Sequence, residues 1–224
     1  MSVTAGMVKN LRQRTGAGMM ECKKALVESE GDIEKAAELL RKKGAASAGK
    51  RAGRIAADGK IVQKISANGK HGVLIEVNCE TDFVARADSF AAFAERVADY
   101  VATRRPKSLD QLLDGSLKTG ESVEDARNTL ISRIGENVSV RRFEILEVEE
   151  GRISGYLHGG KIGVLVSVRN GTEELGHDLA MHIAASNPLG IDEQGIPENT
   201  LAREREIYLS QAEGSGKPAN VVEK

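Results

Sequence analysis

The residues best suited to act on another molecule lie in one short segment, residues 79–86 (CETDFVAR), between a predicted strand and a predicted helix. In this segment a carboxylate, Asp82, precedes a large apolar ring, Phe83, in a chain with four Phe, three Tyr and no Trp. Folded chains usually bury their aromatic rings, whereas connecting loops lie on the surface and often carry binding chemistry. The combination predicts a probe that contacts a partner.

Ordinary structural roles are also open to these side chains. Asp82 is a suitable helix cap or turn residue, and Phe83 could staple the loop to the helix that follows. Met19 and Met20 pose the same choice, because methionine fills cores adaptably and a pair at the start of a helix could equally grip a partner. The residue types alone leave both interpretations open.

An internal duplication favours a functional role for the segment. The strand GVLIEV at residues 72–77 matches GVLVSV at 163–168, and the helix residues Phe93, Ala94 and Val97 match Leu179, Ala180 and Ile183. Strand and helix lie 21 positions apart in the first copy (Gly72 to Phe93) and 16 in the second (Gly163 to Leu179), a difference of five. The five additional residues fall at segment 79–86, so the scaffold can make this turn without them.

Two stretches nearly spell the phosphate-binding loop GxxxxGK[ST], at residues 44–51 and 155–162. Neither ends in the hydroxyl that ligates Mg²⁺, because Arg51 and Ile162 occupy that position. The motif must also join a strand to a helix, whereas the first stretch follows a predicted helix and the second lies in a predicted hairpin. We expect no nucleotide site of this kind.

Metal and catalytic signatures are missing as well. The histidines His71, His158, His177 and His182 form no HExxH pattern, and 177 and 182 do not share a helix face. No nucleophile elbow of the GxSxG type is present, although spacing alone does not exclude a catalytic set. The sequence predicts a protein that is not an enzyme and holds no cofactor or metal.

Composition limits the class of partner and the compartment. The chain has 32 Lys and Arg against 33 Asp and Glu, so its net charge is −1 and no global field attracts nucleic acid or anionic lipid. Cys22 and Cys79 form no CxxC pair, which is typical of a reducing compartment. Neither a signal peptide nor a run of 18 apolar residues is present. We expect a cytoplasmic protein that binds neither a membrane nor nucleic acid directly.

The hydrophobic pattern predicts an α+β fold. Its parts are a three-helix module (1–45), a linker (46–58), a first core subdomain with a hairpin, segment 79–86 and helices (59–137), a second core subdomain with a meander and a helix (138–187), and a projecting helical arm (188–224). Residues 45–57 suit a solvated helical extension about as well as a linker. The two subdomains are the duplicated antiparallel-sheet-and-helix units.

Several element ends have specific signals. Asp32 caps the third helix and Gly44 is placed to end it, while Ser122 caps a later helix that Gly135 ends. Asn68-Gly69 predicts the turn of the first hairpin. The predicted meander comprises residues 138–148, 153–158 and 162–168, a helix follows at 172–186, Pro197 opens the arm helix, and residues 218–224 begin another helix.

Four blocks carry a resemblance to a known family. They are TGAGMMECKKAL at residues 15–26, EVNCETDFVAR at 76–86, IGENVSVRR at 134–142 and YLHGGKIGVLV at 156–166. Together, and in this order, they resemble bacterial elongation factor Ts. The resemblance covers nearly the whole chain, including the helical module, which is similar to the ubiquitin-associated-type N-terminal domain of that family, and the coiled-coil arm.

The resemblance implies a translation elongation factor that exchanges the guanine nucleotide of elongation factor Tu, binding its GDP-bound and nucleotide-free forms. Thr81, Asp82, Phe83 and Val84 match the family segment that wedges into the GTPase and dislodges its Mg²⁺. Other matches to partner contacts are Met19, Met20 and Lys23 in the N-terminal module, and Ile134, Gly135 and His158 in the core. No covalent chemistry is implied.

The end of the chain departs from the family pattern. Long members return through a second arm helix into a C-terminal module, whereas this chain ends at Lys224, inside the returning arm. The resemblance therefore implies a C-terminally truncated chain. The sequence does not decide the oligomeric state, and a homodimer and a 2:2 complex with elongation factor Tu both remain open.

Overall fold

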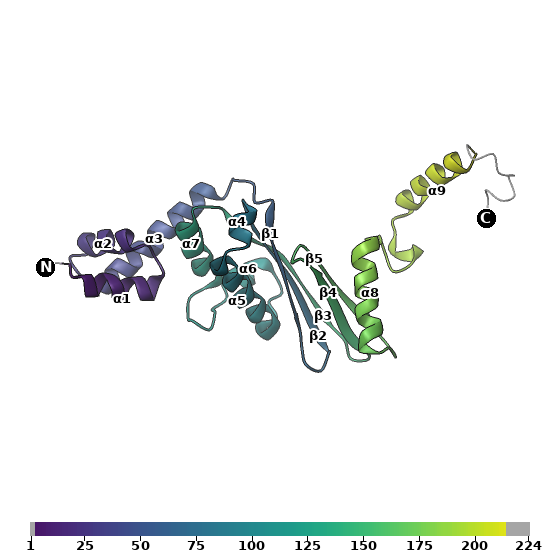
Figure 1. The fold of residues 1–224 in the computed structure, drawn as a ribbon, viewed down its shortest axis with the longest axis horizontal. Coiled ribbons are helices and arrows are strands. Elements are labelled where there is room, and N and C mark those ends of the chain that lie inside the picture. The colour runs from purple at the N-terminus through teal and green to yellow at the C-terminus, as the bar shows by residue number, and fades with distance from the viewer. Residues whose placement is uncertain (1–2, 214–224) are drawn as a thin grey trace. The chain divides into compact units, whose positions relative to one another are not determined.

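The computed structural model describes residues 3–213 and has the predicted α+β class. Figure 1 shows the elements in chain order, which are α1 (Ala5–Thr15), α2 (Met19–Glu28), α3 (Ile33–Arg51), β1 (Asp58–Ile65), β2 (His71–Cys79), α4 (Asp82–Ala85), α5 (Asp88–Arg104), α6 (Leu109–Leu113), α7 (Val123–Ile134), β3 (Val138–Glu147), β4 (Arg152–His158), β5 (Ile162–Val168), α8 (Glu173–Ser186), the 3-10 turn η1 (Glu193–Gly195) and α9 (Glu198–Glu213). The chain divides into two compact units at Ala184, and each unit is described by itself.

The three predicted N-terminal helices are confirmed. Thr4 caps α1 by accepting a hydrogen bond from the Met7 backbone N–H at 3.3 Å, and Asp32 caps α3 by accepting from Glu34 and Lys35. These caps satisfy backbone donors that have no partner inside the helix. The helices enclose a small apolar cluster of Val8, Leu11, Cys22, Ala25, Leu26 and Ala36.

The prediction that Gly44 ends the third helix was wrong. α3 continues to Arg51, so the helical extension that the sequence left open for residues 45–57 is realised to that point. Gly44 is buried inside α3, and a Cβ placed there would lie 3.6 Å from the Asn128 carbonyl oxygen on α7. The helix continues through this glycine because residues 44–51 pack along α7, which a rule for helix ends does not anticipate.

The first sheet is antiparallel in the order β1-β2-β3, and α5 packs on one of its faces. The predicted hairpin is confirmed, with Gly69 at φ 67° in its turn. Alternate residues Val73, Ile75 and Val77 of β2 are buried in the core that the helix completes. From α5, the predicted stripe contributes Phe90, Phe93, Val97 and Val101, none more than 1% exposed.

The predicted meander of three strands was wrong in its pairing. β3 pairs with β2 along its length, from His71 opposite Glu147 to Cys79 opposite Val138, while β4 and β5 form a separate two-stranded sheet. Val138 and Val140 belong to the same core as β2, so burying them requires β3 to join the larger sheet. Strand periodicity shows which residues face a core but does not show which strand is the neighbour.

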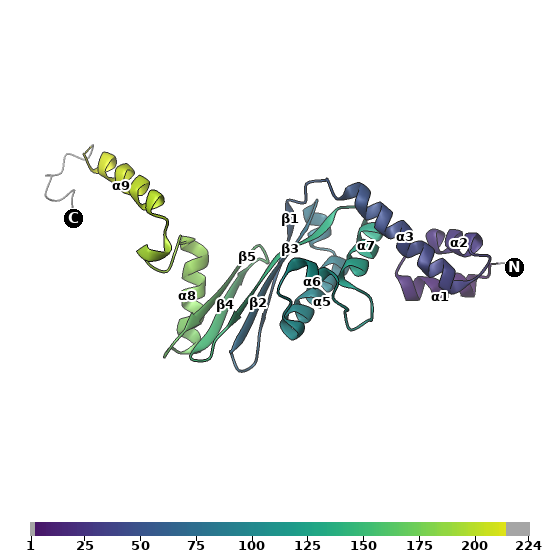
Figure 2. The same ribbon diagram turned by 180° about the vertical axis from the view of Figure 1, so that it is seen from behind.

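The two sheets pack through glycines at matching positions of the duplication. A Cβ on Gly72 would lie 2.9 Å from Ile153 Cγ2, and a Cβ on Gly163 would lie 2.8 Å from Ile61 Cγ2. Each glycine therefore lets the other hairpin approach closely. Figure 2 shows β4 and β5 beside the first sheet, with α8 against them. The predicted helix at 172–186 is confirmed as α8.

The second unit, from Ala185 onward, contains η1 and α9. The predicted arm helix is present as α9, but it begins at Glu198, one residue after Pro197. Ile207, Tyr208 and Leu209 on it are exposed. The helix predicted to begin at residues 218–224 lies outside the described residues. Among residues 3–213, no helix has the length and apolarity needed to cross a membrane.

Candidate functional site

The segment singled out by the sequence forms a single helical turn, α4, between β2 and α5. Thr81 is its N-cap, with Oγ1 accepting from the Val84 backbone N–H at 3.5 Å. Val84 and Ala85 are partly buried against the first core, whereas the Phe83 side chain is 82% exposed. The turn therefore anchors itself by one face and presents an aromatic ring on the other.

Asp82 is a turn residue with a local ion pair and does not provide the cap, and Phe83 is not a staple. Thr81 provides the cap, while Asp82 occupies the first helical position and forms an ion pair with Arg86, Oδ2 to Nη2 at 3.0 Å. A ring that staples a loop to a helix is covered by that helix, and Phe83 is not covered. Phe83 is an exposed aromatic side chain on an ordered backbone turn.

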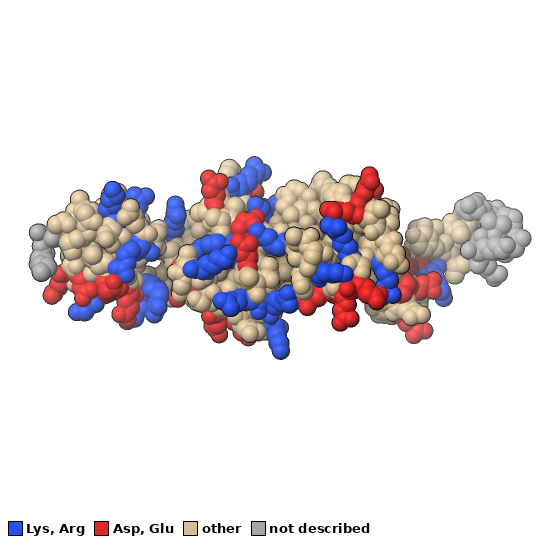
Figure 3. All heavy atoms as spheres, turned by 90° about the horizontal axis from the view of Figure 1, so that it is seen from below, with Lys and Arg blue, Asp and Glu red and all other residues tan. Residues whose placement is uncertain are grey.

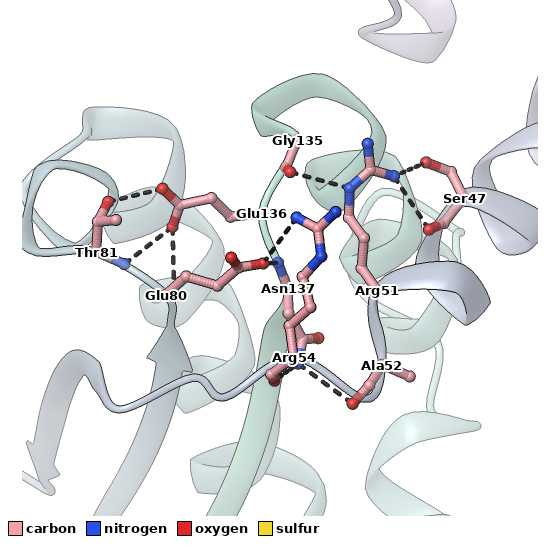
Figure 4. Close-up of polar contacts among 9 residues, drawn as sticks. All are labelled: Ser47, Arg51, Ala52, Arg54, Glu80, Thr81, Gly135, Glu136 and Asn137. Carbon is pink, nitrogen blue, oxygen red and sulfur yellow. Dashed lines mark hydrogen bonds and ion pairs between the residues drawn. The ribbon is translucent and has the colours of Figure 1, made fainter.

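A carboxylate from a distant loop holds the start of this turn (Figure 4). Glu136 Oε2 accepts hydrogen bonds from the backbone N–H of Glu80 at 3.1 Å and of Thr81 at 3.0 Å. Its Oε1 accepts from the Thr81 hydroxyl at 2.7 Å. Hydrogen bonds to an ionised acceptor are stronger than neutral ones, so Glu136 is the principal polar anchor of the turn.

The residues on either side of Glu136 are themselves fixed. Gly135 ends α7 at φ 85°, as predicted, and its carbonyl accepts from Arg51 Nε at 2.9 Å. Asn137 is buried, its backbone N–H donates to Glu80 Oε1 at 2.6 Å, and its side-chain amide donates to the Arg54 carbonyl at 2.8 Å. Residues 135–137, which we call the clamp loop, thus contact both the turn and the end of α3 (Figure 4).

A buried thiol lies beneath the turn. Cys79 Sγ donates to the Thr81 carbonyl oxygen at 3.2 Å. Burial raises the pKa of the Cys79 thiol to about 11, so at neutral pH the group is a protonated donor. A thiol in this state is a poor nucleophile, and Cys79 serves the geometry of the turn.

The core residues Ile134, Gly135 and His158 lie near the same end of the first sheet. Gly135 and Ile134 directly precede Glu136, which contacts the turn. His158 ends β4, is exposed, and its Nδ1 lies 2.9 Å from the Tyr156 hydroxyl. The turn after His158 contacts β1, because Lys161 forms an ion pair with Asp58. Asp58 lies opposite Cys79 in the β1–β2 register, next to the Thr81–Val84 turn.

Met19, Met20 and Lys23 lie together at the start of α2 and are exposed, the two methionines by 58% and 63%. Core filling is therefore not their role. Their spacing places them on neighbouring surface positions of the helix. Within residues 3–213 no hydrogen bond or ion pair joins them to the Thr81–Val84 turn, so the structure presents two separate candidate surfaces.

The phosphate-loop look-alikes are ordinary elements. Residues 44–51 lie inside α3, and residues 155–162 span the β4–β5 hairpin, so neither joins a strand to a helix. No cluster of three or more potential metal ligands is present in the described part of the chain. On the face shown in Figure 3, basic and acidic side chains are interspersed, an arrangement unlike the basic stripe of nucleic-acid-binding proteins.

Comparison with known proteins decides the family. Residues 80–224 match the family model described as Elongation factor TS. The whole chain is 54% identical to Elongation factor Ts of Methylococcus capsulatus and covers 76% of that protein. It is 52% identical to Elongation factor Ts of Thioalkalivibrio sulfidiphilus, with 76% of that protein covered, and 51% identical to Elongation factor Ts of Arthrospira platensis, with 90% covered. The chain belongs to the elongation factor Ts family.

As a member of the elongation factor Ts family, the chain is a translation elongation factor of protein biosynthesis. The sequence had singled out the turn, but it assigned no role to Glu80, Glu136 or Asn137. Glu136 and Asn137 lie inside the block IGENVSVRR that carried the resemblance, next to Ile134 and Gly135. An acidic residue directly after a helix-ending glycine was the available signal, although nothing local indicated what it binds.

Proposed function

We propose that this chain is the guanine nucleotide exchange factor of elongation factor Tu. It binds the GDP-bound GTPase, inserts the Thr81–Val84 turn and dislodges Mg²⁺, so that GDP leaves. The observation that carries the proposal is the Phe83 ring, which is 82% exposed. It lies on a turn whose first residues are hydrogen-bonded to Glu136, in the loop after α7. In a family of translation elongation factors, an aromatic side chain presented in this way is suited to enter a partner.

The physical basis is indirect displacement. Mg²⁺ and oriented backbone groups hold the phosphates of a bound nucleotide, so moving them removes much of the electrostatic binding without any contact to GDP. Linkage requires that the nucleotide weaken factor binding by the same free energy. Shifting a two-state equilibrium of the complex from 1:99 to 99:1 takes about 5.5 kcal/mol of differential affinity. A buried aromatic anchor with its surroundings supplies a good share of that free energy. The role is non-catalytic.

In this proposal, two further surfaces bind the same partner. Met19, Met20 and Lys23 contact the nucleotide-binding domain of elongation factor Tu, and Ile134, Gly135 and His158 contact a further domain. The exposure of the methionines and of His158 supports these assignments. The division of the chain follows as a proposal too: a partner-binding module at 1–45, two core subdomains within 59–187, and an arm from 188. The predicted boundary at 137/138 is corrected, because β3 belongs to the first subdomain.

The test is release of fluorescent GDP from elongation factor Tu. The parent chain is expected to accelerate release, and Phe83→Ala and Asp82→Ala to lose roughly 30-fold of that effect, the size of a hot spot worth about 2 kcal/mol. Ile191→Ala is the matched control, because Ile191 is fully exposed outside the proposed surfaces. Circular dichroism verifies folding.

Two outcomes would count against the proposal in different ways. If the parent does not accelerate release, the exchange function is wrong. If the parent accelerates release and Phe83→Ala does so equally, the function stands and the wedge is wrong. A loss in Ile191→Ala as large as in Phe83→Ala would mean that the assay does not report on the turn.

A further inference from the structure

We infer that Glu136 is a positioning residue that holds the Thr81–Val84 turn in its partner-ready shape before the partner arrives. The effect on GDP release rests on the proposed function, whereas the effect on the turn rests on geometry alone. Glu136 itself need not touch the partner. Its role is to raise the population of the competent turn in the free protein.

The local interactions of the turn hold its shape only weakly. α4 has four residues, and isolated helices much shorter than about 12 residues are marginal in water. The cap from Thr81 Oγ1 to the Val84 N–H is 3.5 Å long, beyond the usual range of about 2.7–3.2 Å. The Asp82–Arg86 ion pair is solvent-exposed, the arginine by 80%, and such pairs contribute little.

Glu136 adds the main polar restraint to the packing of Val84 and the hydrogen bond from the Cys79 thiol. Its carboxylate makes three short contacts, two with the backbone N–H groups of Glu80 and Thr81 and one with the Thr81 hydroxyl. Both backbone donors lie just before the first helical residue, so fixing them fixes the direction in which α4 begins. Val84 then packs inward and Phe83 points away from the core.

The clamp loop is rigid enough to act as a support. On one side of Glu136, the Gly135 carbonyl accepts a hydrogen bond from Arg51. On the other side, the buried Asn137 donates hydrogen bonds to Glu80 and to the Arg54 carbonyl. These contacts come from segments far away in the sequence (Figure 4). The contacts with Arg51 and Arg54 do not involve the turn, so the backbone that carries Glu136 keeps these two supports when the turn is disordered, which is the condition for one element to position another.

Removing the Glu136 carboxylate should lower the fraction of free molecules whose turn is in the competent shape. The structure of the bound state should stay the same. Thr81 is exposed, so water can hydrate the freed donors and the turn becomes disordered while the core stays folded. The apparent dissociation constant rises by the inverse of the competent fraction. Once bound, the turn has the same shape, so the maximal release rate stays the same. Loss of Phe83, by contrast, lowers the maximal rate.

The experiment measures GDP release over a range of factor concentrations. Glu136→Ala is expected to raise the half-saturating concentration about tenfold, equivalent to about 1.4 kcal/mol, with the maximal rate within about twofold of the parent. Glu136→Gln should restore near-parental behaviour, because its amide oxygen can accept the two backbone hydrogen bonds and its NH₂ can donate to Thr81 Oγ1. Glu144→Ala is the charge-matched control, since Glu144 is exposed on β3 and no ion pair involves it within residues 3–213.

A second readout needs no partner. Amide hydrogen exchange in the free protein should accelerate roughly tenfold at Glu80, Thr81 and Val84 in Glu136→Ala, and not in Glu136→Gln or Glu144→Ala. Thr81→Val removes the hydroxyl's hydrogen bonds to Glu136 Oε1 and to the Val84 N–H but keeps the two backbone bonds to Glu136. It should therefore give a smaller increase at Glu80 and Thr81. If the parent does not accelerate GDP release, the exchange function fails while this measurement still tests the inference.

Three results would overturn the positioning role. One is unchanged amide exchange at the turn in Glu136→Ala. Another is a lower maximal rate at an unchanged half-saturating concentration, which would place Glu136 in the displacement step. The third is global unfolding of Glu136→Ala together with parental exchange in Thr81→Val, which would make Glu136 a residue of the fold.

Discussion

The chain joins a hairpin to a helix twice, and the two connections differ. Residues 80–87 link β2 to α5 and include the helical turn α4, whereas residues 169–172 link β5 to α8 directly. The short connection uses local means, with Asn170 at φ 59° and the Thr172 hydroxyl accepting from the Leu175 N–H at 3.1 Å. The long connection depends on Glu136, 55 residues away from Thr81.

The difference shows that the long connection is not needed to make the topology. A local cap is sufficient where the only task is to begin a helix. Where an aromatic ring must be presented to solvent, the chain adds a helical turn and holds it by a tertiary contact. The sequence of residues 169–172, Arg-Asn-Gly-Thr, includes no aromatic side chain.

The two helices that follow also differ in burial. Phe90 and Phe93 of α5 are almost completely buried, whereas Leu175 and Leu179 of α8 are 47% and 38% exposed. The first copy of the duplication therefore supplies a firm base for the turn. The second copy has a more exposed helix, α8.

The largest expected effect comes from exchanging the connections. Replacing residues 80–87 with a copy of residues 169–172 should leave a folded protein that no longer accelerates GDP release, because the presented ring is gone while the scaffold remains. Circular dichroism and the release assay measure the two properties. Retained acceleration would remove the turn from the mechanism, and an unfolded protein would show that the scaffold needs the long connection.

Shortening one apolar side chain near the start of each helix compares how much the two helices contribute to their cores. Phe90→Ala should lower the free energy of unfolding by about 3–5 kcal/mol, because a fully buried ring leaves a cavity. Leu175→Ala should cost less than about 1 kcal/mol, since the side chain is half-exposed. Urea unfolding measures both, and equal costs would contradict the difference in burial.

Substituting Gly135, which directly precedes Glu136, tests whether the backbone conformation of the clamp loop positions the Glu136 carboxylate. Gly135→Ala should lower the free energy of unfolding by about 1 kcal/mol, because φ at Gly135 is 85° and a side chain is strained there. It should also raise amide exchange at Thr81. The matched control is Gly49→Ala in α3, where a Cβ has nothing within 4 Å, and it should be neutral or slightly stabilising. Thermal unfolding would contradict the prediction if the two variants shifted equally.

The smallest effect concerns the cap of the short connection. Thr172→Ala removes the acceptor of the Leu175 N–H and should cost about 0.5–1 kcal/mol of stability. GDP release should be unchanged, because this connection carries no proposed contact. A release defect comparable with that of Thr81→Val would show that both connections take part in exchange.

Much of the fold was predictable because it depends on local rules. The caps Asp32 and Ser122, the end of α7 at Gly135 and the Asn-Gly hairpin are confirmed, since each depends on the backbone preference of a few adjacent residues. The same rules failed at Gly44, because α3 continues through this buried glycine to Arg51. They failed again at β3, whose partner strand is distant in sequence.

The candidate site divides in the same way. The turn could be found from the sequence, because the duplication isolated its additional residues and a known motif covers them. Glu136 could not be assigned, because its contacts with Glu80 and Thr81 are non-local and its neighbouring residues give no sign of them. The orientation of Phe83 was also undecided, since the same residue suits a buried staple and an exposed probe.

The sequence by itself determined the element types, the family and the segment that differs between the two copies, because periodicity, capping and motif spacing are written in adjacent residues. Only the tertiary structure decided that β3 completes the first sheet, that Gly44 lies in a helix contact and that Glu136 holds the turn with Phe83 exposed. These outcomes depend on which distant groups meet once the core is packed, and neighbouring residues do not encode that meeting.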